Sequence, residues 1–164
     1  MNRYQFSFLN KAQAAHVLPE LFDILYYNMS KITPAEKDCE ADRAEWLEAV
    51  LPAIQKAPRQ ILLMHEGDML AGYLQYYVNN GVFMVEEIQL KPAYQRTLLL
   101  HRLCRFLATV IPADTGYIEA FAHPKNVISQ AIQRSLGMEL VGTEENGTLH
   151  FRGNCQILFD RFLK

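Results

Sequence analysis

Residues 126–138 read NVISQAIQRSLGM, and this stretch does most to decide the fold. Apolar side chains recur in it at helical spacing, which predicts a short helix from Asn126 to Leu136. Asn126 follows Pro124 as a helix cap would, and Gly137 ends the helix as a C′ glycine should. The side chains expected to face inward are those of Ile128, Ala131, Ile132, Ser135 and Leu136.

Upstream of this helix, the chain alternates between strand and helix patterns. Residues 88–96 read IQLKPAYQR and end a predicted strand from Val82 to Leu90. A helix is predicted from Thr97 to Val110, and a strand from Tyr117 to Ala122. A strand, a crossover helix and a second strand imply a parallel pair.

The part of the chain before residue 82 predicts a strand, helices and then a hairpin. Alternating aromatic residues from Tyr4 to Leu9 predict the first strand. Asn10 can cap a helix that Pro19 interrupts, and Thr33-Pro34-Ala35-Glu36 begins another helix, which Pro58 ends.

Turn signals define the hairpins. Two strands, Ile61 to Met64 and Met69 to Val78, are predicted to precede the Asn80-Gly81 turn, which suits a type I′ hairpin. After the helix of residues 126–136, the segments Met138 to Thr143 and Thr148 to Phe162 are predicted to form a last hairpin. The sheet is therefore expected to be mostly antiparallel.

Composition excludes several classes of protein. With 164 residues, half of them apolar and 21% charged, the chain is predicted to fold as one domain, residues 1–164. Sixteen Lys and Arg against 18 Asp and Glu give a net charge of −2, so no nucleic-acid partner is expected. Neither a membrane-length apolar run nor a signal-peptide pattern is visible. Three cysteines outside any C-x-x-C spacing predict a reduced, cytoplasmic protein without a metal.

Together, residues 88–96 and residues 126–138 resemble the GNAT acetyltransferase superfamily. Residues 88–96 are similar to the family's fourth strand, which runs through a proline and an aromatic residue into the cofactor loop. Residues 126–138 are similar to the family's motif that begins with Asn and ends with Leu-Gly-Phe. The resemblance implies an α/β fold of GNAT type, with a mixed sheet, a central parallel pair and flanking helices. An unrelated α/β ligand-binding domain would lack the parallel pair between Val82–Leu90 and Tyr117–Ala122.

The resemblance also implies acetyl-CoA as co-substrate. In the family, backbone amides at the start of a helix meet the pyrophosphate, and the acyl thioester lies along the preceding strand. The cofactor-binding residues predicted in this way are Ile88, Gln89, Leu90, Arg96, Thr97, Leu98, Leu99, Leu100, His101, Asn126 and Gln133.

This chain departs from the family pattern in the loop. Leu98 and Leu100 stand where the family has glycine, or glycine and alanine. A leucine forced into left-handed geometry costs roughly 1–2 kcal/mol, and lost amide bonds would weaken binding further. Alternatively, the loop keeps ordinary helical angles, its amides stay available, and the leucines point into the core. The sequence leaves both alternatives open.

Another departure concerns proton transfer. Gln133 stands where many family members have a tyrosine that protonates the leaving thiolate, so release would need water or another group. The attacking amine must lose a proton, and Glu86, Glu87 and Glu119 are the candidate bases. Alternation favours Glu86, which falls among apolar residues, although a solvated sheet edge would also explain it. His150 is expected at the surface.

The function predicted from this resemblance is N-acetyl transfer. An acetyl group would pass from acetyl-CoA to a primary amine of a small molecule or peptide by direct attack. The alternative is a catalytically weak or inactive GNAT-like domain that serves as a binding or regulatory module. No membrane partner is expected, and the chain is expected to be a monomer or a homodimer.

Overall fold

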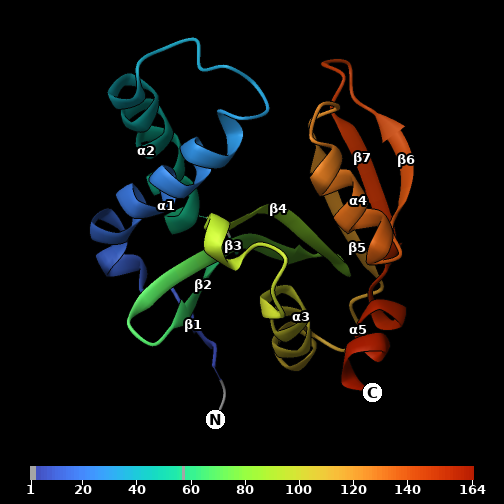
Figure 1. Cartoon of the computed structure of the whole chain (residues 1–164). Helices are drawn as coiled ribbons and strands as arrows, with labels where there is room; N and C mark the ends of the chain where they lie inside the picture. The colour runs from blue at the N-terminus through green and yellow to red at the C-terminus, as the bar shows by residue number, and fades with distance from the viewer. Residues whose placement is uncertain (1–2, 57) are drawn as a thin grey trace. The chain divides into compact units, whose positions relative to one another are not determined.

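The computed structural model describes residues 3–56 and 58–164 (Figure 1). Its seven strands form one sheet in the order β1-β2-β3-β4-β5-β7-β6. The sheet is mostly antiparallel, and β4 and β5 form the parallel pair. The predicted fold class is therefore confirmed. The chain divides into two compact units, which are described in turn.

The first unit contains the residues up to Gln75 and the segment Glu87–Thr97. Its elements are β1 (Gln5–Phe8), the 3₁₀ helix η1 (Lys11–Gln13), α1 (Ala14–Met29), α2 (Cys39–Lys56), β2 (Gln60–Glu66), most of β3 (Met69–Asn79), the end of β4 (Val82–Leu90) and the 3₁₀ helix η2 (Pro92–Tyr94). Helices α1 and α2 lie side by side (Figure 1). Their apolar faces share a buried cluster with β2 and β3 that includes Leu18, Leu21, Ile54 and Tyr73.

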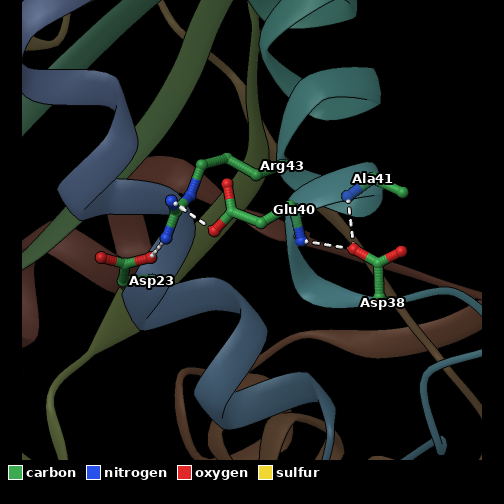
Figure 2. Close-up of polar contacts among 5 residues, drawn as sticks. All are labelled: Asp23, Asp38, Glu40, Ala41 and Arg43. Atoms are coloured by element: carbon green, nitrogen blue, oxygen red, sulfur yellow. Dashed lines mark hydrogen bonds and ion pairs between the residues drawn. The ribbon is translucent and has the colours of Figure 1, made fainter.

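Both helices of this unit differ from the prediction, α1 at Pro19 and α2 at its start. Asn10 does act as a cap, since its side chain accepts a hydrogen bond from the Ala12 amide, but α1 continues through Pro19. Proline removes one N–H from the helix ladder, and the buried α1 face outweighs that single loss. The second helix begins at Cys39 and not near Thr33. Figure 2 shows why: the Asp38 carboxylate accepts hydrogen bonds from the amides of Glu40 and Ala41.

The second unit contains Tyr76–Glu86 and Leu98–Lys164. Its complete elements are α3 (Leu99–Val110), β5 (Tyr117–Ala122), α4 (Val127–Ser135), β6 (Glu139–Thr143), β7 (Leu149–Asn154) and α5 (Cys155–Leu163). The parallel ladder pairs Val82–Val85 with Tyr117–Ala120. Gly137 has a φ of +83°, as its place at the end of α4 predicted.

The last segment of the chain corrects one prediction. β7 ends at Asn154, and the residues predicted to extend it form α5 instead. The Asn154 side chain accepts a hydrogen bond from the Ile157 amide, which caps the new helix. Cys155, Leu158 and Phe159 are buried, and this i, i+3, i+4 spacing is that of a helix face.

The face that α4 turns inward also differs from the prediction. Val127 and Ile128 are 68% and 66% exposed, whereas Gln133 is only 6% exposed. Ala131 and Ser135 are exposed as well, so the apolar stripe faces out. On the buried side of the helix, Gln133 Nε2 donates to the Phe121 carbonyl oxygen of β5 at 3.4 Å. Among the described residues, no helix is long and apolar enough to cross a bilayer.

Candidate active site

Strands β4, β5 and β7 of the second unit present one face that carries polar side chains. Met84 of β4 is opposite Glu119 of β5, and Glu119 is opposite Arg152 of β7. Residues paired in this way point to the same side of a sheet. The other side carries Phe83, Ile118 and Phe151, which are buried. The sheet therefore separates an apolar core from a polar face.

Both carboxylate oxygens of Glu119 have side-chain partners on this face. Its Oε2 lies 2.9 Å from His150 Nε2, and its Oε1 lies 2.9 Å from Arg152 Nε. The His150 ring stacks on Phe121 at 4.5 Å between centroids, and the Arg152 guanidinium lies 4.1 Å from the Tyr117 ring centroid. Both Glu119 oxygens are thus engaged, and its side chain is 12% exposed. A carboxylate with both oxygens in such contacts is well placed to hold β5 and β7 together, and less well placed to take a proton from a substrate.

The other two predicted bases point to opposite sides of β4. Glu86 follows Met84 by two residues and shares its face, the same face as Glu119. Glu87 alternates to the other face. There, within the first unit, burial and the nearby Glu87 carboxylate hold the pKa of Tyr73 well above its ordinary value. Within the second unit, Glu86 and Glu119 therefore share one face of the sheet. In the first unit, Glu87 lies on the side of β4 that Tyr73 approaches.

The predicted acyl-arm residues end β4 in the first unit. The Asn28 side-chain amide donates to Gln89 Oε1 at 2.9 Å and to the Leu90 carbonyl oxygen at 3.0 Å. Gln95 Nε2 donates to the same Leu90 oxygen at 3.0 Å. Ile88 is half-buried in this strand. The network fixes the end of β4 through the carbonyl of Leu90.

The loop after β4 shows which alternative its leucines follow. Leu98 has φ −74° and ψ 2°, and Leu100 lies inside α3, so neither adopts left-handed geometry. The left-handed residue is Arg96, with φ +62°. Leu98 is 67% exposed rather than in the core, and Leu99 takes the buried place. Thr97 Oγ1 donates to the Tyr94 carbonyl oxygen at 2.7 Å.

The start of α3 has the chemistry of an anion site. Its N-cap is Leu98, whose side chain has no hydrogen-bond acceptor, and its first turn continues Leu-Leu-His-Arg. The helix's own ladder begins with the Arg102 amide, which donates to the Leu98 carbonyl oxygen. Backbone N–H groups before that point, including those of Leu100 and His101, stand outside the ladder at the positive end of the helix dipole. These residues fit a phosphate group.

Helix α4 supplies the two remaining predicted cofactor residues. Asn126 Oδ1 accepts a hydrogen bond from the Ser129 amide at 3.0 Å, which confirms Asn126 as a helix cap. Gln133 Nε2 is used by the Phe121 carbonyl oxygen and by Ser129 Oγ at 3.3 Å. Within the described part of the chain, the buried Gln133 Oε1 has no hydrogen-bond partner. An amide N–H of a bound pantetheine arm is a donor of the kind that this oxygen lacks.

Two residues of the polar face were not recognised in the sequence. Arg152 was not singled out, and His150 was expected at the surface without a role. Their alternation on one strand puts them on one face, which the sequence could have indicated. Their contact with Glu119 depends on the register between β5 and β7, which no local pattern specifies.

Comparison with known proteins identifies the fold. No family model and no curated protein sequence matches the chain. Among solved structures, it resembles the PaiA N-acetyltransferase of Thermoplasma acidophilum, which contains coenzyme A, with 11% identity over 92% of this chain and 98% of that chain and a TM-score of 0.68. It also resembles an acetyltransferase of Thermus thermophilus, with 15% identity over 92% of this chain and 96% of that chain and a TM-score of 0.71. A third similar structure is the ribosomal-protein-S5-alanine acetyltransferase of Vibrio fischeri, with 15% identity over 94% of each chain and a TM-score of 0.63. The chain has the fold of the GNAT acetyltransferases.

Proposed function

We propose that this protein is an acetyl-CoA-dependent N-acetyltransferase that acts on a primary amine of a small molecule or peptide. The fold supports the proposal, because the structural neighbours described above are acetyltransferases and one of them contains coenzyme A. The observation that carries it is the start of α3, where a right-handed Leu98 leaves backbone amides available to an anion.

Binding would rest on groups of three kinds. The amides of Leu100 and His101, at the positive end of α3, would hold the pyrophosphate. Gln133 Oε1 would accept a hydrogen bond from the pantetheine arm, because a buried acceptor without a partner is costly. In the first unit, the N–H groups of Ile88–Leu90 are the predicted partners of the acyl carbonyl, as the family resemblance implies. When bound, acetyl-CoA supplies the electrophilic thioester.

Proton removal falls to Glu86 in this proposal. An alkylammonium group has a pKa near 10.4, so making it neutral at pH 7 costs roughly 4 kcal/mol. Glu86 would accept that proton, either directly or through water. Glu119, held by His150 and Arg152, would keep the face in place. Since Gln133 cannot act as an acid, the leaving thiolate would take its proton from water.

A screen of amines with acetyl-CoA tests the proposal. Free thiol release would be followed with a thiol reagent, against a reaction without amine as the blank. We expect amine-dependent thiol release and an acetylated amine identified by mass spectrometry. Binding of acetyl-CoA without turnover of any amine would favour the alternative of a binding or regulatory module, and the absence of binding would reject the proposal.

A further inference from the structure

One asparagine near the end of α1 connects three segments of the first unit. Asn28 Nδ2 donates to Gln89 Oε1 at 2.9 Å and to the Leu90 carbonyl oxygen at 3.0 Å. Asn28 Oδ1 accepts a hydrogen bond from Gln95 Nε2 at 3.3 Å, and Gln95 Nε2 also donates to the Leu90 oxygen at 3.0 Å. Helix α1, the end of β4 and the segment after η2 therefore meet at a single side-chain amide.

The peptide group between Leu90 and Lys91 is held from both sides. On one side, the Leu90 carbonyl oxygen accepts hydrogen bonds from Asn28 and Gln95, which uses both of its lone pairs. On the other side, the Lys91 amide donates to the Ala71 carbonyl oxygen of β3 at 2.9 Å. Because a trans peptide group is planar, with its C=O and N–H pointing in opposite directions, these contacts fix its orientation.

A glycine of β3 lets β4 approach closely at the same point. A Cβ atom at Gly72 would overlap the Gln89 carbonyl oxygen, so this carbonyl faces β3. In an extended strand, the neighbouring residues Ile88 and Leu90 present their N–H and C=O groups on the opposite side. Of the residues predicted to meet the acyl carbonyl, Ile88 and Leu90 thus have N–H groups that point away from β3. Asn28 binds β4 on that same side.

We propose that Asn28 is a positioning residue for acetyl transfer, an inference that rests on the proposed function. It holds the end of β4 so that the N–H groups of Ile88 and Leu90 keep the direction in which they polarise the acyl carbonyl. Gln95 assists, because it shares the Leu90 oxygen with Asn28. Asn28 acts through the backbone of β4 and touches neither the thioester nor the amine.

The chemistry of the amide explains which substitutions are informative. An amide group donates two hydrogen bonds and also accepts, and Asn28 uses both abilities. Asn28→Asp keeps the size of the side chain, removes both donors and sets a carboxylate against the Leu90 carbonyl oxygen. Asn28→Ala removes the contacts without adding a charge. A small displacement of groups aimed at a reacting carbonyl lowers the rate by a large factor.

Steady-state kinetics of the full chain, with acetyl-CoA and an amine that it acetylates, tests the proposal. We expect kcat to fall at least about tenfold in Asn28→Asp and about threefold in Asn28→Ala. The Kd for coenzyme A, measured by calorimetry, should change less than about threefold, because coenzyme A has no acyl carbonyl. Asn79→Asp is the matched control, since it makes the same change at an exposed position at the end of β3.

The outcomes separate a positioning role from a purely structural one. Equal kcat for Asn28→Asp and Asn79→Asp would overturn the inference, and so would a rise in Kd for coenzyme A as large as the fall in kcat. Gln95→Met removes the second donor to Leu90 without changing α1, so its expected threefold fall in kcat tests the same clamp if Asn28→Asp does not fold. An unmodified protein that acetylates no amine would reject the proposed function and the inference with it, whereas unchanged variants of an active enzyme would reject the inference alone.

Discussion

His150 Nε2 lies 2.9 Å from Glu119 Oε2, within hydrogen-bond distance, and the ring donates to that oxygen in the tautomer that carries its hydrogen on Nε2. The other Glu119 oxygen accepts from Arg152. One carboxylate therefore connects β5 to two residues of β7. Glu119 thus bridges β5 and β7, and its role as a base stays a prediction.

Replacing Glu119 should reduce stability. In Glu119→Gln, the side chain keeps its size but loses its charge, and an NH₂ group replaces the acceptor oxygen of one of its two partners, His150 or Arg152. We expect the free energy of unfolding to fall by about 1–3 kcal/mol, measured by urea denaturation. Glu145→Gln, in an exposed turn, is the control. A loss for Glu119→Gln no larger than that of the control would mean that the contact adds no stability.

Glu86 is the proposed base, so Glu86→Gln should slow acetyl transfer at neutral pH by at least about tenfold. The amine loses its own proton at alkaline pH, and the difference between the variant and the unmodified enzyme should shrink there. Initial rates measured across pH with one amine substrate test both expectations. A constant ratio of rates across pH would assign Glu86 a structural role, and equal rates at neutral pH would remove it from the mechanism.

Leu98 offers a test in which stability and cofactor affinity move in opposite directions. Leu98→Asp would add a helix cap to α3 and raise its stability by about 1 kcal/mol. The added carboxylate would repel a pyrophosphate bound at the same amides, so KM for acetyl-CoA should rise at least tenfold. Leu98→Asn adds a cap without the charge and should raise KM less. If Leu98→Asp stabilises the protein and leaves KM unchanged, the pyrophosphate binds elsewhere.

The cysteines should differ in reactivity. Burial raises the pKa of Cys104 to about 12 and that of Cys155 to about 11, while Cys39 is only half-buried. We expect Cys39 to react first with a thiol reagent at pH 8, and the other two to react only on unfolding. Mass spectrometry after timed alkylation identifies the modified residue. Early labelling of Cys104 would contradict the burial that the structure gives it.

The same two pKa values set an alkaline limit to stability. Unfolded thiols release their protons near pH 9, whereas the folded state keeps them until about pH 11–12. Unfolding therefore releases protons in this window, and stability should fall as the pH rises above 9. The variant Cys104→Ala should show a smaller loss across this window, as measured by thermal unfolding at several pH values. An equal loss would assign the alkaline sensitivity to other groups.

Local signals in the sequence were enough to predict the features that define the fold. The Asn126 cap, the Gly137 end of α4 and the parallel pair of β4 with β5 were all predicted, because each depends on residue type or on element order. The α5 helix was missed, although Asn154 and the spacing of Cys155, Leu158 and Phe159 indicate it. The residues after Asn154 had been included in the second strand of the predicted last hairpin, Thr148 to Phe162.

The site was less accessible to sequence reasoning than the fold. Hydrophobicity alone predicted that α4 buries its apolar stripe, whereas the structure buries Gln133, which donates a hydrogen bond to β5. The pairing of Glu119 with His150 and Arg152 depends on strand register. The residue type of Leu98 does not decide between a left-handed loop and a loop with ordinary helical angles. The backbone angles of the structure exclude the left-handed loop.

Calorimetric titration of the unmodified protein with acetyl-CoA tests the central claim most directly. We expect one binding event per chain with a Kd on the order of micromolar, because backbone amides at the start of α3 would hold the pyrophosphate beside a Leu98 of negative φ. Affinity should drop when the pyrophosphate-bearing nucleotide is removed and pantetheine alone is titrated. Absent or millimolar binding of acetyl-CoA would contradict the account, and only the GNAT fold would then stand.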